Sequence, residues 1–115
     1  MIPMNFFKYC SLFLIMFNVF SCYAADKCFN VFSAKDYLEI EKMCKIQCDD
    51  NQSLACMLLG DFYSNSIDKQ DYDKAKKYSE KACLLGHSIG CFNVAIIYIA
   101  GKGVKIDHDL ASIFL

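Results

Sequence analysis

Apolar residues recur at helical spacing from Ser33 onward. Four of them fall near one face of a helix: Tyr37, Ile40, Met43 and Cys44. A second apolar segment, LACMLLGDFY (54–63), follows after only the polar residues DDNQS. Two helices joined by so short a turn must run antiparallel. The pattern therefore predicts a helical hairpin, with Ser33 and Asp36 as an approximate capping box at its start.

The same scheme recurs further along the chain. Asp71 opens the segment DYDKAKKYSEKACLL, Gly86 is placed to end that helix, and residues 89–99 supply the return helix. Comparison of each residue n with n+35 between 36 and 63 gives seven identities: Asp36/Asp71, Tyr37/Tyr72, Lys42/Lys77, Cys48/Cys83, Ser53/Ser88, Cys56/Cys91 and Tyr63/Tyr98. This agreement, which includes both cysteines, is an internal repeat.

A third unit begins after Tyr98, with the repeat slipped by one residue. Three residues of the second unit correspond to residues 36 positions later: Asp73 to Asp109, Ala75 to Ala111, and Tyr78 to Phe114. The sequence therefore predicts an all-α fold of α/α hairpin repeats, with two hairpins and the start of a third. We expect units at residues 36–70 and 71–106, and a truncated third unit at 107–115.

The first 24 residues have the layout of a signal peptide. Lys8 precedes an apolar run from Tyr9 to Phe20 that is shorter than the roughly 20 apolar residues needed to span a bilayer. Cys22 and Ala24 occupy the two recognition positions for a cut after Ala24. A lipoprotein modified at Cys22 and an uncleaved anchor are the alternatives. Export predicts a secreted or periplasmic protein, with residues 25–35 as its N-terminal segment.

Eight cysteines are present, and removal of residues 1–24 would leave six. In an oxidising compartment six cysteines predict three disulfides. Cys48 and Cys56, like Cys83 and Cys91, are eight residues apart. On one continuous helix that spacing is about 12 Å, beyond disulfide reach, whereas across a tight hairpin the pair can meet. Cys28 and Cys44 are then left to pair, although six cysteines allow fifteen connectivities.

The charge balance and the histidines exclude several kinds of partner. The chain has 12 Lys+Arg against 13 Asp+Glu, so nothing favours binding to nucleic acid or to an anionic membrane surface. We expect no membrane contact unless Cys22 is lipidated. Only His87 and His108 could add imidazole ligands to a zinc site, so we expect no metal and no cofactor. His87 is expected to be a solvated turn residue.

The second unit resembles the Sel-like repeat, a relative of the tetratricopeptide repeat. The family pattern has a lysine–alanine helix, a cysteine, Leu-Gly, a second cysteine, Asn, Tyr, Gly-x-Gly-Val and Asp; these fall on Lys74-Ala75, Cys83, Leu85-Gly86, Cys91, Asn93, Tyr98, Gly101-Lys102-Gly103-Val104 and Asp107. The paired cysteines narrow the resemblance to the Helicobacter cysteine-rich protein family. It implies a disulfide-stapled superhelix like that of tetratricopeptide repeats over about 36–115. In the first unit, Leu58 replaces the Asn and SNSID replaces the glycine loop.

The resemblance implies that the chain binds a peptide or protein, because the fold belongs to a class that does so. On a groove-lining helix of such repeats, Asn93 can hydrogen-bond the backbone or a carboxylate of a bound peptide. We expect Asn93, Tyr72 and Tyr98 to form the binding surface together with the glycine loop. Packing between stacked hairpins is the simplest role for the repeated tyrosines, and Lys102 is expected to be a solvated loop residue. A peptide- or protein-binding scaffold is the function that we favour.

The same resemblance implies an alternative, because proteins of this family have been described as penicillin-binding proteins with weak β-lactamase activity. The ligand would then be a β-lactam or a peptidoglycan-like small molecule. Ser66 and Lys69 form an S-x-x-K match, and Tyr63-Ser64-Asn65 forms a Y-x-N match. In serine β-lactamases these motifs lie far apart in the chain, whereas here they crowd one loop in reversed order without a K-T-G. The catalytic residues are therefore unknown, with Ser66 and Lys69 as candidates.

Overall fold

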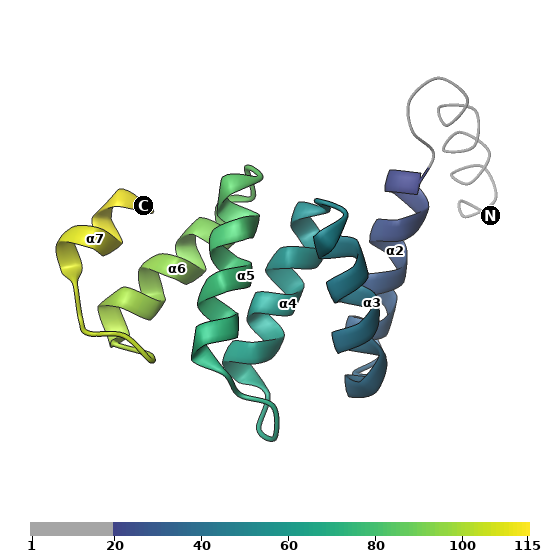
Figure 1. Cartoon of the computed structure of the whole chain (residues 1–115), viewed down its shortest axis with the longest axis horizontal. Helices are drawn as coiled ribbons and strands as arrows, with labels where there is room; N and C mark the ends of the chain where they lie inside the picture. Colours follow the sequence, from purple (N-terminus) through teal and green to yellow (C-terminus); the bar gives the residue numbers. More distant parts are fainter. Residues whose placement is uncertain (1–19) are drawn as a thin grey trace.

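Six α-helices form the part of the chain that the computed structural model describes, residues 20–115 (Figure 1). They are α2 (Phe20–Ser33), α3 (Tyr37–Asp49), α4 (Ser53–Asn65), α5 (Tyr72–Leu84), α6 (Ser88–Ala100) and α7 (His108–Ile113). The prediction of an all-α fold is confirmed: α3–α4 and α5–α6 are the two hairpins, and α7 starts a third. Between residues 20 and 115, no helix has both the length and the apolar composition needed to cross a membrane.

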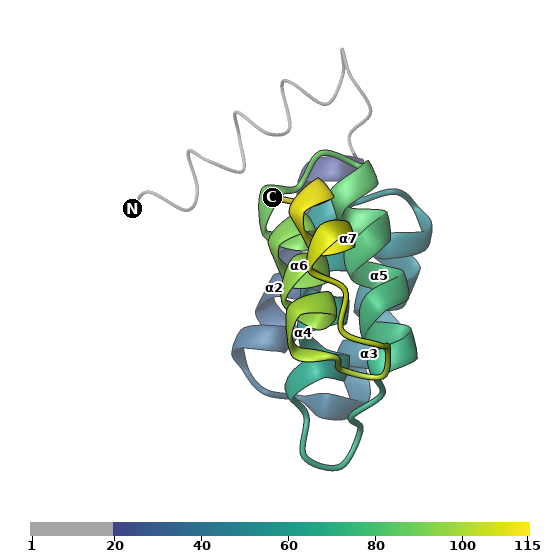
Figure 2. The same cartoon turned by 90° about the vertical axis from the view of Figure 1, so that its left-hand side faces the viewer.

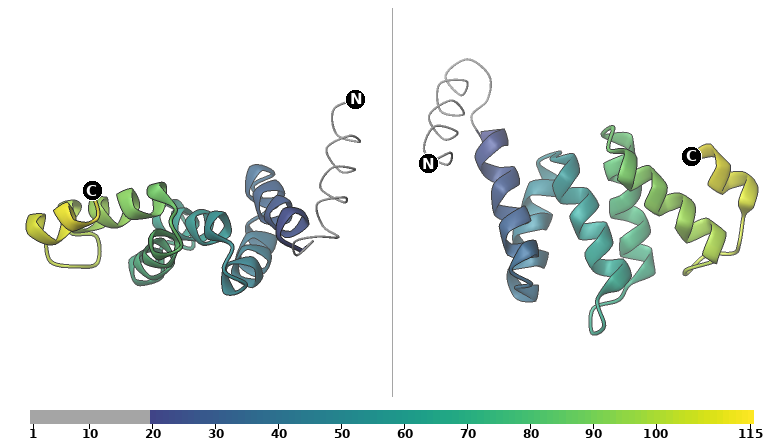
Figure 3. Two further views of the ribbon diagram at one scale, coloured as in Figure 1. Left: turned by 90° about the horizontal axis from the view of Figure 1, so that it is seen from above. Right: turned by 180° about the vertical axis from the view of Figure 1, so that it is seen from behind.

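The helices form an elongated array of two rows. Seen from above, α3 and α5 lie in one row and α2, α4 and α6 in the other (Figure 3), and the view along the array shows the same division (Figure 2). The molecule extends 48 × 30 × 24 Å. Each helix packs against the next one along the chain, and α4 also contacts α2 and α6 within its own row, as expected for stacked repeats.

Helix α2 is an element that the sequence analysis did not assign. The predicted signal peptide covers residues 1–24, of which 1–19 lie outside the described residues, and the predicted cut after Ala24 falls inside α2. A three-residue turn connects α2 to α3. In this turn Lys35 has a φ of +56°, and the N–H of Asp36 donates to the carbonyl of Val31 at 3.1 Å. These features are those of a Schellman turn.

An aspartate caps each of α3, α5 and α7. Asp36, Asp71 and Asp107 each accept a hydrogen bond from the backbone N–H three residues on, at 3.4, 3.1 and 2.8 Å. The predicted capping box at Ser33 is therefore wrong, because Ser33 is the last residue of α2 and the carboxylate of Asp36 does the capping. The caps at 36, 71 and 107 follow the repeat of 35 residues and its later slip by one.

Both hairpin turns have the same backbone geometry. Asn51 and Gly86 are repeat equivalents with φ of +61° and +91°. After each of them the next N–H donates back to the helix: Gln52 to the carbonyl of Gln47 at 3.0 Å, and His87 to that of Ala82 at 2.9 Å. A positive φ is accessible to glycine and, less readily, to asparagine. The turns therefore keep one shape with two different residues.

Three disulfides link described residues, and they match the predicted pairs. Cys48–Cys56 and Cys83–Cys91 close the two hairpins with Cα separations of 4.6 and 4.5 Å, and Cys28–Cys44 joins α2 to α3 at 4.8 Å. The four cysteines that join α2 to α3 and close the first hairpin are all fully buried: Cys28, Cys44, Cys48 and Cys56. Cys83 and Cys91 are only half-buried.

Aromatic stacks join one hairpin to the next. Tyr63 of α4 stacks on Tyr78 of α5, with ring centroids 5.8 Å apart. At the repeat-equivalent place, Tyr98 of α6 stacks on Phe114 at 6.2 Å. The predicted packing role of these tyrosines is confirmed. Close approach of α4 to α5 requires Gly60, because a Cβ there would lie 2.5 Å from Ser79 Oγ.

Candidate functional site

A small cleft lies between α4 and α6 and contains the predicted binding residue Asn93. Its volume is about 110 Å³, and it is lined by Asp61, Ser64, Asn65, Asn93, Ile96, Ile97 and Lys102. Asn93 lies in the second turn of α6 and is half-buried. The cleft is therefore built from the exposed edge of two neighbouring helices in one row, together with the loop that follows α6.

The glycine loop brings Lys102 to this cleft. Gly101 ends α6 with a φ of +67°, and the N–H of Lys102 donates to the carbonyl of Ile97 at 3.0 Å. A Cβ on Gly101 would lie 2.8 Å from Cγ1 of Ile106, so both conformation and space favour glycine here. The loop thus turns back toward α6 and places the Lys102 side chain beside Asn93.

Lys102 also connects the cleft to Tyr72. Its Nζ lies 5.9 Å from the centroid of the Tyr72 ring, within the range of a cation–π interaction. Gly103 permits this approach, because its φ is +70° and a Cβ there would lie 2.8 Å from the Cβ of Tyr72. Lys102 is half-buried. The expectation of a solvated loop residue is therefore wrong, since the glycine loop holds this side chain against the helices.

The polar groups of the cleft differ in whether they have partners. The Asp61 carboxylate accepts a hydrogen bond from Asn65 Nδ2 at 2.8 Å. Among the described residues, nothing hydrogen-bonds the amide of Asn93 or forms an ion pair with the ammonium of Lys102. An amide supplies donors and an acceptor, and an ammonium supplies three donors. Together they suit a carbonyl or carboxylate group of a ligand.

Tyr98, the third predicted binding residue, does not line this cleft. Its ring stacks on Phe114, and Lys76 Nζ lies 5.6 Å from the ring centroid. A hydrogen bond to Tyr98 is the main cause that raises the pKa of Lys76 above its ordinary value. The structure thus gathers Asn93, Lys102 and Tyr72, and it places Tyr98 at the contact between α6 and α7.

A larger pocket of about 510 Å³ lies where the start of α3 meets the end of α4. It is lined by Phe32, Lys35, Tyr37, Ile40, Asp61, Phe62, Asn65, Ser66, Ile67, Asp68 and Lys69. Its floor is apolar, and the loop between α4 and α5 forms one wall. The two candidate catalytic residues, Ser66 and Lys69, therefore share a pocket.

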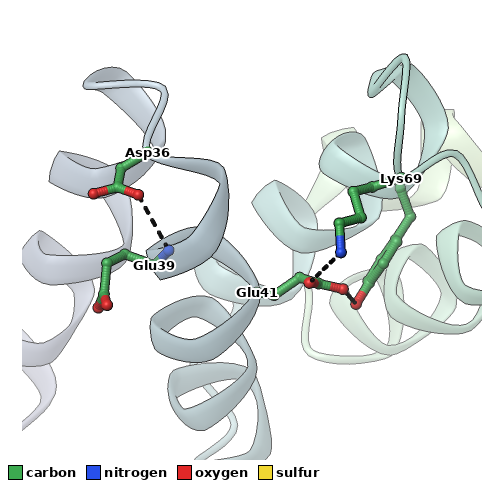
Figure 4. A network of polar contacts seen from close by, with 5 residues as sticks. Asp36, Glu39, Glu41 and Lys69 are labelled. Atoms are coloured by element: carbon green, nitrogen blue, oxygen red, sulfur yellow. Dashed lines mark hydrogen bonds and ion pairs between the residues drawn. The ribbon is translucent and has the colours of Figure 1, made fainter.

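The geometry of Ser66 and Lys69 differs from that of an S-x-x-K site. Ser66 is the C-cap of α4, where its N–H donates to the carbonyl of Phe62 at 3.0 Å, whereas the serine of that motif begins a helix. Lys69 Nζ lies 3.6 Å from Glu41 Oε2 (Figure 4). A general base needs a neutral amine, and an ion-paired ammonium has no lone pair to offer.

The same Glu41 holds Tyr63 in the core. The phenol of Tyr63 donates to Glu41 Oε1 at 2.8 Å. Burial first, and the Glu41 carboxylate second, raise the pKa of Tyr63 well above its usual range. Glu41 therefore links α3, α4 and the following loop, which is a structural role that the sequence analysis did not identify.

His87 is not the solvated turn residue that we expected. It is half-buried, and its Nδ1 is buried without a hydrogen-bond partner among the described residues. The Schellman bond from its N–H to Ala82 draws it against the end of α5. Between residues 20 and 115, no three His, Cys, Asp or Glu side chains are grouped so as to hold a metal ion.

Comparison with known proteins gives one family and a few partial relatives. The Sel1 repeat model matches residues 53–87 and 88–112. These spans pair α4 with α5 and α6 with α7. Each matched repeat therefore begins one helix later than the units that we expected at 36–70 and 71–106. The boundaries of those units stay predictions. No solved structure matches the chain significantly.

The relatives each match only part of the chain. A protein named putative beta-lactamase HcpC from Helicobacter pylori is 48% identical over 42 residues, which are 36% of this chain and 14% of that protein. Cytochrome c oxidase assembly factor 7A from Xenopus laevis is 41% identical over 66 residues, 56% of this chain and 29% of that protein. Beta-lactamase HcpA from Helicobacter pylori is 45% identical over 42 residues, 17% of its length. The chain thus spans less than a third of each relative.

Proposed function

The chain belongs to the Sel1 repeat family, and we propose that it is an extracytoplasmic scaffold that binds a peptide segment of another protein in the cleft between α4 and α6. Sel1 repeats form scaffolds for protein–protein interaction, which agrees with a protein ligand. Stacked helical repeats offer extended surfaces for such partners. The proposal adds the place of binding and the chemistry of the contact.

The observation that carries the proposal is the pair of unpartnered polar groups in that cleft. The Asn93 amide and the Lys102 ammonium line the same cleft, and the Tyr72 ring makes a cation–π contact with the lysine. In this proposal Asn93 pairs with a backbone amide of the bound segment, and Lys102 pairs with a carboxylate. A charge-assisted hydrogen bond of this kind is stronger than a neutral one.

The disulfides support a location outside the cytoplasm. Three bridges among the described residues are typical of an oxidising compartment, and the Helicobacter relatives are consistent with it. We propose that the N-terminal residues direct export, so that the protein is secreted or periplasmic. The β-lactamase names belong to proteins of which this chain covers 14–17%, and no contact of Ser66 or Lys69 favours that chemistry here.

The experiment uses the oxidised chain and a fluorescent peptide library in two forms, with free and with amidated C-termini. We expect binding that prefers a carboxylate and that weakens about tenfold or more in Asn93→Ala and in Lys102→Ala, because each variant removes one polar contact. Lys105→Ala is the matched control, since Lys105 lies in the same loop, is exposed and does not line the cleft. Equal affinities for all three variants would contradict the proposed site.

A further inference from the structure

The larger pocket, where the start of α3 meets the end of α4, is open because of the way the chain leaves α4. The C-cap, Ser66, has an extended conformation with φ −71° and ψ 132°, and the next residue, Ile67, is 97% exposed. In the second hairpin the C-cap is Gly101, with φ +67° and ψ 38°, and Lys102 after it turns back onto Tyr72. In the first hairpin the residue at the place of Lys102 thus stays in solvent and leaves the pocket uncovered.

The walls of this pocket are largely aromatic. Tyr37, the repeat equivalent of Tyr72, is 55% exposed, and its ring centroid lies 6.1 Å from that of Phe62. Phe32, from the end of α2, and the buried Ile40 line the same pocket. Aromatic rings that pack together gain energy beyond their buried area. The pocket therefore suits an aromatic group of a ligand.

The pocket adjoins the cleft that contains Asn93 and Lys102. Asp61 and Asn65, in the last turns of α4, line both of them. Among the described helices, α4 lies between α2 and α6 in its row (Figure 3), so the pocket and the cleft lie on either side of its C-terminal end. A ligand held in the cleft can reach the pocket by crossing this one helix.

The two shared residues offer hydrogen-bond acceptors along that path. Asn65 Nδ2 donates to Asp61 Oδ1 at 2.8 Å and to the Asp61 carbonyl at 3.2 Å. Among residues 20–115, nothing hydrogen-bonds Asn65 Oδ1 or Asp61 Oδ2. The backbone N–H groups of an extended peptide are donors that such oxygens can accept. This chemistry favours a peptide chain as the ligand that links the cleft to the pocket.

We propose that the peptide segment bound in the cleft crosses the end of α4 and inserts an aromatic side chain into the pocket. This inference rests on the proposed function and adds a sequence preference to it. The width of one helix is about 10 Å, which an extended chain covers in about three residues. With its C-terminal carboxylate on Lys102, the bound segment carries the aromatic residue about three or four positions before its end.

Fluorescence anisotropy with the oxidised full chain and a set of short peptides tests this preference. The peptides are serine-rich, end in a free carboxylate and carry one phenylalanine at each position in turn, and an all-serine peptide is the reference. We expect phenylalanine to tighten binding at least about tenfold when it stands about three or four positions before the end. If phenylalanine has no effect at any position while binding still depends on Asn93, the inference is overturned and the cleft site remains.

Tyr37→Ala tests the pocket itself, because Tyr37 lies in the first turn of α3 and more than half of its surface is exposed. In this variant we expect the gain from phenylalanine over the all-serine peptide to fall below about threefold. Leu38→Ala is the matched control, since Leu38 is the next residue, is 81% exposed and does not line the pocket. An undiminished gain in Tyr37→Ala, folded by circular dichroism, would overturn the pocket assignment. Binding that depends on Tyr37 but not on Asn93 or Lys102 would instead overturn the proposed cleft site and, with it, the crossing of α4.

Discussion

The hairpins α3–α4 and α5–α6 share one backbone plan and differ in what surrounds them. Each has an aspartate cap, a Schellman turn and a disulfide between residues eight apart. In the first hairpin both cysteines are fully buried, whereas in the second both are half-buried. Among the described residues, the first hairpin lies between α2 and α5, and the second lies between α4 and α7 (Figure 1). Position in the array, rather than the repeat itself, decides how deeply equivalent residues are buried.

The difference in burial between the two hairpins also distinguishes a core position of the first hairpin from the proposed binding position of the second. Leu58 and Asn93 are repeat equivalents; Leu58 is 6% exposed and belongs to the core, and Asn93 is half-buried in the cleft. A polar side chain at 58 would be buried without a partner, which is costly. The half-buried place of Asn93 beside the cleft therefore permits the polar group on which the proposed function depends.

The largest expected effect comes from removing one disulfide at a time. Each hairpin loop has the same length, so loss of either bridge costs about 2.5 kcal/mol in chain entropy. Cys48→Ala with Cys56→Ala also leaves space in the buried core, which adds about 1–2 kcal/mol. We therefore expect about 4 kcal/mol for this pair and about 2.5 kcal/mol for Cys83→Ala with Cys91→Ala, measured by urea unfolding. Equal losses would show that burial of the first bridge adds nothing.

A smaller effect is expected at the close contact between α4 and α5. In Gly60→Ala the new Cβ would meet Ser79 Oγ and, at 3.1 Å, the Ser79 backbone nitrogen, so we expect a loss of about 2 kcal/mol from overpacking. The equivalent residue in the second hairpin is already Ala95, which is fully buried. There Ala95→Gly should cost about 1 kcal/mol through helix propensity. If thermal unfolding instead shows Gly60→Ala to be neutral or stabilising, the helices can separate at no cost.

The smallest effect concerns Tyr63 and its counterpart Tyr98. Loss of the hydrogen bond to Glu41 in Tyr63→Phe should cost about 1 kcal/mol at neutral pH. Because the folded-state pKa of Tyr63 is raised, the unfolded chain ionises first, near its ordinary pKa of about 10. The stabilisation is thus present below that pH and falls as pH rises above it. Unfolding measured from pH 8 to 11 should show a shallower alkaline decline in Tyr63→Phe than in Tyr98→Phe, and identical slopes would contradict this account.

The hairpins and the disulfides that close them could be predicted from the sequence because they depend on local spacing, whereas Cys28–Cys44 was assigned only as the remaining pair. Apolar periodicity and cysteines eight apart each have one simple interpretation for a tight helical turn, whereas the cap of α3 was expected at Ser33 and lies at Asp36. Helix α2 could not be found in this way. Its residues follow an apolar segment typical of a signal peptide, and its turn uses Lys35 at a positive φ, where glycine or asparagine would have marked the end of a helix.

The candidate site was predictable only in part, for a similar reason. Asn93 was identified by its place in the family pattern, and Gly101 and Gly103 indicated an unusual loop. The direction of the Lys102 side chain depends on how that loop folds onto Tyr72, and this is a tertiary contact that no local pattern encodes. Glu41 is a comparable case, because its two partners, Tyr63 and Lys69, are 22 and 28 positions away.

The three described disulfides cross-link two parts of the molecule separately, one on each side of the loop at 66–70. Two bridges lie before the loop at 66–70 and one lies after it, so none of them crosses that loop. The loop is also open to proteases, since Ile67 is almost completely exposed. A single cut there would leave two separately cross-linked fragments that adhere through the contacts of α4 with α5 and α6. The array is therefore covalently cross-linked within each part, and one proteolytic event between them can divide it.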